Sequence, residues 1–148
     1  MVVVGIMAIL ASVAVPGFLG WLPNYRMRSA ADEVLSTLQQ AKLRAVRENA
    51  VVTVTFSTAN DSFRAFLDNG AGADAGNGSQ EAGEATVKNG RMPAGIDLES
   101  ATFVPGPATM VQFTSRGFPT RSGNIIIANG GPIKRTIELT LGGSSSIQ

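Results

Sequence analysis

The sequence contains no cysteine and no histidine among its 148 residues. Without cysteine, the chain has no disulfide framework and no thiolate ligand for a metal ion. Without histidine, it lacks the commonest general base near neutral pH and the usual partner of a nucleophilic serine. We therefore predict a protein that is not an enzyme and that has no catalytic residues, no cofactor, no metal ion and no small-molecule substrate.

Charge is also scarce, since charged residues make up 16% of the chain, against roughly 25% in soluble domains. The first charged side chain is Arg26, so the opening stretch MVVVGIMAILASVAVPGFLGW carries none. A helix of that length measures about 30 Å, the thickness of a bilayer core. No basic region precedes the apolar run, which argues against a cleavable signal peptide. We predict a transmembrane helix over residues 1–25, whose small residues would also allow close packing against other helices.

The following stretch, residues 24–49, has the spacing of an amphipathic helix. Its apolar positions recur every three or four residues and are Met27, Ala31, Val34, Leu35, Leu38, Ala41, Ala45 and Val46. Pro16 and the Pro23–Asn24 pair are the two places where the chain could bend. We predict one long, bent helix that is apolar in its first half and continues over residues 26–50 with one buried face.

Beyond residue 50 the pattern changes to short β-branched and aromatic runs separated by turn residues. The predicted strands are residues 51–57, 62–68, 84–89, 95–104, 109–115, 123–129 and 134–141. Such spacing favours an antiparallel sheet pair or sandwich. The predicted fold is therefore α+β: a long helix packed on a β-domain of residues 51–141, followed by a flexible tail, 142–148. Together, residues 26–148 form the globular domain.

One long loop, residues 69–83, is rich in glycine and has no large apolar residue that could anchor it. Four polar side chains in or beside it resemble a calcium-binding loop superficially: Asp68, Asn69, Asp74 and Asn77. Their spacing does not match the D-x-[DN]-x-[DN]-G pattern, and no glutamate follows at the required position. We expect a solvated, poorly ordered loop.

Several motifs together resemble one family across nearly the whole chain. They are Ala14-Val15-Pro16-Gly17-Phe18, the helix with Arg28, Ala30-Ala31, Leu35, Ala41, Arg44-Ala45-Val46 and Asn49, then Arg91-Met92-Pro93-Ala94-Gly95, Phe113-Thr114-Ser115-Arg116-Gly117 and the strand–turn–strand 123–141. This pattern is similar to type IV pilin-like proteins, and more narrowly to the minor pseudopilins and minor pilins of the GspH/FimT family.

The resemblance implies a structural subunit at or near the tip of a type II secretion pseudopilus or a type IV pilus. Such a subunit sits in the inner membrane as a single-pass protein with a periplasmic domain, and an inner-membrane assembly platform then moves it into a filament of other pilins. The residues implied to pack in the filament core are Val2, Val3, Val4, Ile6, Ile9, Leu10, Val13, Pro16 and Phe18. Aligning Pro16 with the family proline implies that a leader and about six mature residues, with the methylation site, lie upstream of Met1.

The alternative function is DNA binding during natural uptake, as in some FimT-like minor pilins. Those relatives use an arginine-containing C-terminal stretch, whereas the tail here, LGGSSSIQ, has no arginine. The remaining candidates for weak DNA contacts are Arg116, Arg121, Lys134 and Arg135. Phosphate binding needs several clustered cations, and charged residues on strands also serve to discourage edge-to-edge pairing. We therefore expect DNA binding to be weak or absent.

Overall fold

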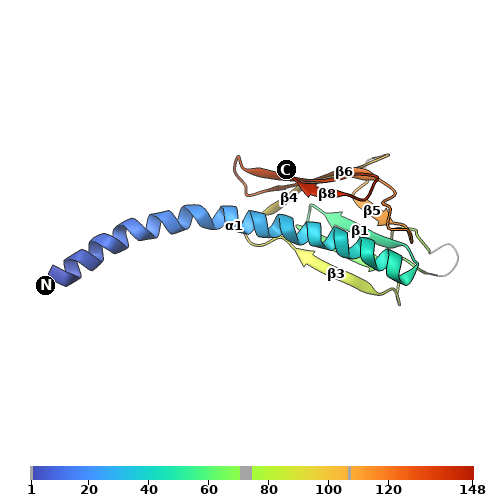
Figure 1. The fold of residues 1–148 in the computed structure, drawn as a ribbon, viewed down its shortest axis with the longest axis horizontal. Helices are drawn as coiled ribbons and strands as arrows, with labels where there is room; N and C mark the ends of the chain where they lie inside the picture. The colour runs from blue at the N-terminus through green and yellow to red at the C-terminus, as the bar shows by residue number, and fades with distance from the viewer. Residues whose placement is uncertain (1, 71–74, 107) are drawn as a thin grey trace.

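In a computed structural model of the protein, the described backbone covers residues 2–70, 75–106 and 108–148. The side chains in these ranges are described too, except those of residue 2 and residues 4–21. One helix, α1 (Val2–Glu48), runs without interruption through Pro16 and Pro23. Its first half curves away from the rest of the molecule (Figure 1). Proline removes one hydrogen bond and crowds the preceding turn, so a long helix bends at such a residue without having to end there.

The remainder of the chain forms two four-stranded antiparallel sheets. The first sheet has the order β3-β2-β1-β5, and its strands are β1 (Val52–Ser57), β2 (Ser62–Leu67), β3 (Thr86–Arg91) and β5 (Met110–Phe113). The second has the order β4-β6-β7-β8, and its strands are β4 (Asp97–Val104), β6 (Ser122–Ala128), β7 (Lys134–Leu139) and β8 (Ser145–Ile147). The predicted α+β architecture is confirmed.

The second half of α1 lies beside both sheets and contacts strands of each sheet (Figure 1). The predicted apolar stripe is confirmed at its centre, because Val34, Leu38 and Ala41 are at most 1% exposed. The predicted stripe is confirmed at both ends too, since Ala31 and Ala45 are fully buried, whereas the neighbouring Val46 is 51% exposed. The buried face also includes Thr37, whose hydroxyl donates a hydrogen bond to the backbone oxygen of Glu33 at 2.8 Å. A hydroxyl satisfied within its own helix can be buried at little cost.

Aromatic side chains join the two sheets inside the core. Phe56 of β1 lies 5.7 Å from Phe103 of β4 and 6.4 Å from Phe63 of β2, measured between ring centroids. All three are buried, and they belong to the same apolar cluster as the stripe of α1. Because aromatic rings bury large apolar areas, these contacts hold helix and sheets together as one core.

The tail is not the frayed end that the sequence predicted. Ser145–Ile147 pairs with β7 as strand β8, and Gln148 exchanges two backbone hydrogen bonds with Thr136, at 2.8 and 3.2 Å. Ile147 is half-buried against the core. The β-domain therefore continues to the end of the chain, because the open edge of β7 offers hydrogen bonds that outweigh the low strand propensity of serine.

The packing of α1 predicts that Leu38→Asp destabilises the domain, because it buries an unpaired charge at a position that is 1% exposed. We expect a loss of about 4 kcal/mol or more in the free energy of unfolding, measured by chemical denaturation. Leu43→Asp is the matched control, since Leu43 lies on the same helix and is 68% exposed. Equal stability of the two variants would contradict the packing.

The pairing of β8 predicts that deletion of residues 145–148 lowers the melting temperature. The deletion removes the backbone bonds to β7 and the contact of Ile147 with the core. We expect a fall of about 5–10 °C, measured by circular dichroism. Ser146→Ala, at an exposed position of the same strand, should leave the melting temperature unchanged. A truncated chain as stable as the intact one would show that β8 contributes nothing.

Candidate interaction surfaces

The backbone of the first half of α1 projects beyond both sheets (Figure 1). Among the described side chains of the helix, Met27 is the first that is buried, and Leu22 and Tyr25 before it are exposed. Of the residues expected to pack in a filament core, Val3 is described, and its side chain is 66% exposed. The structure does not describe the side chains of the other residues expected there, which are Val2, Val4, Ile6, Ile9, Leu10, Val13, Pro16 and Phe18. Within the described part of the chain, no helix is both long enough and apolar enough to span a membrane.

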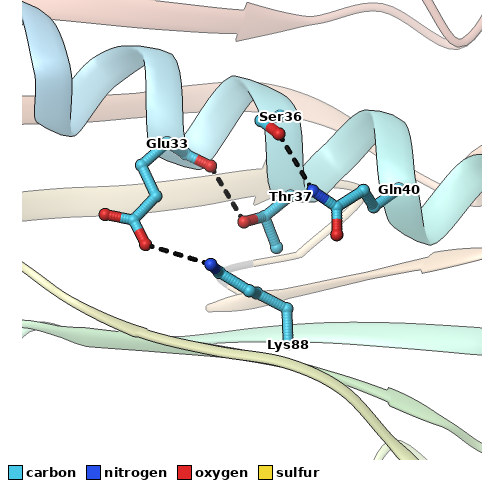
Figure 2. Close-up of polar contacts among 5 residues, drawn as sticks. All are labelled: Glu33, Ser36, Thr37, Gln40 and Lys88. Carbon is cyan, nitrogen blue, oxygen red and sulfur yellow. Dashed lines mark hydrogen bonds and ion pairs between the residues drawn. The ribbon is translucent and has the colours of Figure 1, made fainter.

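Polar contacts join α1 to the sheets (Figure 2). Glu33 and Lys88 of β3 form an ion pair at 3.4 Å, whereas the hydrogen bond from Gln40 to the hydroxyl of Ser36, at 3.0 Å, lies within the helix itself. Further along, Lys42 Nζ donates to the backbone oxygen of Gly143 at 3.1 Å. Surface contacts of this kind contribute little stability. The ion pair connects the helix to β3, and the Lys42 bond connects it to the β7–β8 turn.

The four candidate DNA-binding residues are not brought together. Arg121 directly precedes β6, whereas Lys134 pairs with Ala128 at the other end of that strand, so the two are separated by about 20 Å along the sheet. Lys134 is already in an ion pair with Glu99, and Arg121 donates to the backbone oxygen of Met110. Arg121 and Lys134 thus each have a local partner, and the length of β6 keeps them apart.

Arg116 and Arg135 do not restore a continuous basic surface. Arg116 is exposed in the turn that follows β5. Arg135 is half-buried and lines a small surface hollow with Arg28 and Asp32 of α1. An acidic side chain therefore lies within the same hollow as these two cations. A phosphate backbone would meet no stripe of four neighbouring cations in this arrangement.

A buried carboxylate organises the outer face of the first sheet. Asp68 follows β2 directly and is 1% exposed. Its carboxylate accepts hydrogen bonds from Thr53 Oγ1 at 2.6 Å and from the backbone N–H groups of Gly76 and Gly78 at 2.7 and 2.9 Å. Gln112 of β5 adds a fourth donor, Nε2, at 3.3 Å. The segment after β2 is thereby held across the neighbouring strands β1 and β5, above side chains that point away from α1.

Two more carboxylates lie beside Asp68, at the point where the loop returns to β3. Glu84 accepts hydrogen bonds from the backbone N–H groups of Gly70 and Glu81, at 2.9 and 3.0 Å. One carboxylate oxygen each of Asp68, Glu81 and Glu84 can be chosen so that all three lie within 4.8 Å of one another. Two unit charges at that distance repel by about 3 kcal/mol at an effective dielectric constant near 20. Backbone N–H groups that donate to Asp68 and Glu84 offset part of this repulsion.

The sequence did not predict this cluster, because the loop has no apolar anchor and its acidic residues match no linear motif. The described parts of the loop, residues 69–70 and 75–83, are tied down by polar groups instead. Of the residues weighed as a calcium-like loop, Asn69 is exposed, Asn77 donates to Glu81 Oε1 at 2.8 Å, and Asp74 lies outside the described residues. The available signal was an aspartate directly after a strand, followed by glycines whose N–H groups can approach it closely.

The family described as type II transport protein GspH matches residues 30–143 of the sequence. The chain belongs to the GspH family. No curated protein matches the sequence closely enough to count as a relative. The matched residues contain the buried face of α1 from Ala30 onward, strands β1 to β7 and the carboxylate cluster, whereas the projecting first half of the helix precedes them and β8 follows them.

Solved structures share the fold of this GspH-family chain at low sequence identity. The type IV minor pilin FimU of Pseudomonas aeruginosa superposes with a TM-score of 0.62 at 17% identity, covering 84% of this chain and 90% of that one. The minor pseudopilin EpsH from the type 2 secretion system of Vibrio cholerae gives a TM-score of 0.60 at 15% identity, covering 83% of this chain and 96% of that one. The resemblance seen in the sequence is thus confirmed for both family and fold.

The dispersion of the cations predicts weak DNA binding by the full-length chain in detergent micelles. At ~150 mM salt we expect a Kd for duplex DNA no tighter than the ~10⁻⁴ to 10⁻⁶ M of nonspecific binding, measured by fluorescence anisotropy. Replacing Lys134 and Arg135 together by alanine should leave this value unchanged. Tighter binding that the double variant abolishes would contradict the prediction.

Proposed function

We propose that this protein is a structural minor subunit, located at or near the tip of a type II secretion pseudopilus or a type IV pilus. Before assembly, residues 1–25 anchor it in the inner membrane with the globular domain in the periplasm. The assembly platform then transfers it into the filament, where other pilins become its partners. Its role is mechanical and not enzymatic.

The observation that carries the proposal is the division of α1. One continuous helix has a second half whose stripe is fully buried in its own domain and a first half that projects free of it. A projecting helix of uncharged, apolar and small residues can be accommodated by lipid and by neighbouring helices alike. The same helix would thus serve as membrane anchor and as filament core.

Membership of the GspH family supports the assignment to type II transport. The structural likeness extends to proteins of both machines, since FimU is a type IV minor pilin and EpsH a pseudopilin of a type 2 secretion system. The proposal therefore covers both filaments, and the phenotype of a deletion distinguishes them. Loss of protein secretion assigns the chain to the first, and loss of surface pili to the second.

The test is complementation of a deletion strain of the host organism. Deletion should abolish secretion or pilus assembly, and the wild-type gene should restore it. Ile9→Asp should fail to restore it, because an aspartate at the centre of a membrane helix costs about 2.5–3.5 kcal/mol and would also disturb the filament core. Filaments are counted by electron microscopy, and secreted protein is measured by immunoblot.

Ile133→Asp is the matched control, because Ile133 lies between β6 and β7 and is 41% exposed. It should complement as well as the wild type. Full activity of Ile9→Asp at equal protein levels would overturn the proposed role of the projecting helix. A filament in which this chain is the most abundant subunit would overturn its assignment as a minor component.

A further inference from the structure

Two arginines far apart in the sequence, Arg28 of α1 and Arg135 of β7, line one surface hollow of about 330 Å³ with Ala31, Asp32 and Ile147. Arg28 is exposed and Arg135 is half-buried. Neither arginine belongs to an ion pair among the described residues. A guanidinium group stays protonated at any physiological pH. Two guanidinium groups and one carboxylate therefore leave the hollow with a net positive charge of about one.

The hollow lies at the end of the domain from which the projecting half of α1 emerges (Figure 1). Arg26, which is two residues before Arg28, donates to the backbone oxygen of Ala94 at 3.4 Å. Ala94 lies between β3 and β4. The first residue of β4 is in register with the last residue of β6 and, through it, with the first residue of β7. Arg135, the second residue of β7, is thus held close to the level at which the helix leaves the domain.

In the proposed function this end of the domain faces the bilayer, because residues 1–25 are the membrane anchor. Arg28 follows Trp21 by seven residues, or about 10 Å of helix, and the headgroup layer on each side of a bilayer is about 5–8 Å thick. Side chains of a helix tilt toward its N-terminus, so the long side chain of Arg28 can reach back to the headgroups. Tyr25 lines an adjoining hollow with Arg28, and aromatic residues are enriched at membrane interfaces.

We propose that Arg28 and Arg135 bind the phosphodiester group of an anionic phospholipid in the inner membrane. The proposal rests on the membrane anchor of the proposed function. Guanidinium groups match phosphate oxygens with paired N–H donors. The headgroup of phosphatidylglycerol carries one negative charge, which balances the net charge of the hollow, whereas phosphatidylcholine has no net charge. A nucleic-acid backbone needs a row of cations, but a single headgroup needs only these two.

Binding at this place determines how the domain is oriented before assembly. The hollow lies on one side of α1, between the helix and the second sheet. A headgroup held there fixes the rotation of the domain about the axis of its own anchor. Entry into the filament would then require the release of this lipid, because the domain leaves the membrane surface together with the helix.

The test uses the single tryptophan of the chain, Trp21. The full-length chain is reconstituted into vesicles of phosphatidylglycerol and phosphatidylcholine, one of which carries brominated acyl chains that quench tryptophan fluorescence on contact. The two quenching curves give the relative binding constant of the two lipids beside Trp21. We expect a preference for phosphatidylglycerol of about fivefold or more, the effect of one basic residue near an anionic surface. The double variant Arg28→Gln/Arg135→Gln should bring the ratio close to one.

Arg47→Gln is the matched control, because it removes the same charge from an exposed arginine about 28 Å further along the helix. It should keep the preference of the wild type. Circular dichroism shows whether the double variant is folded, and Arg28→Gln alone, at an exposed position, should lower the preference at least twofold without affecting the fold.

Equal quenching by the two brominated lipids in the wild type would overturn the proposal and leave the membrane anchor intact. The same preference in the wild type and in the folded variants would also overturn it, since the arginines would then not be the ligands. An absence of quenching by either lipid would overturn the membrane anchor itself, and with it both the proposed function and this proposal.

Discussion

The burial of one face of α1 is the contact on which the rest of the structure depends. The stripe around Leu38 packs against strands of both sheets, so the two sheets share one core with the helix. Each sheet has only four strands, and its apolar face has to be covered by another element. Helix burial therefore does two things at once. It completes the core of the domain, and it gives the projecting half of the same helix a rigid base.

The two halves of α1 meet different requirements with different compositions. The buried half has fully buried alanines at Ala31, Ala41 and Ala45, and larger buried residues between them. Its solvent-facing side carries charges, some of them engaged with β3 and with one another. The projecting half has no charge before Arg26. One element can thus join two environments without a linker, which suits the mechanical role proposed for this GspH-family chain.

The first sheet is covered on both faces by different kinds of contact. Its inner face meets α1 through apolar side chains, while Thr53, on the opposite face, is buried under the segment that Asp68 holds. Hydrogen bonds to a charged group are stronger than those between neutral groups, and they are also directional. A glycine-rich segment with no apolar anchor can therefore be held by its backbone N–H groups, provided that a carboxylate lies beneath it.

The sequence by itself determined the helix, the strands before residue 142 and the family, because hydrophobic period and turn residues are local properties of the chain. It also determined the buried face at Val34 and Leu38. Only the tertiary structure decided that Val46 is exposed, that Ser145–Ile147 is a strand, and that Asp68 meets Glu81 and Glu84. Each of these depends on a partner distant in the sequence: the extent of the sheets beneath the helix, the open edge of β7, and the return of a long loop to β3. Such partners leave no periodic signal in the segment itself, so these three features are visible only in the folded structure.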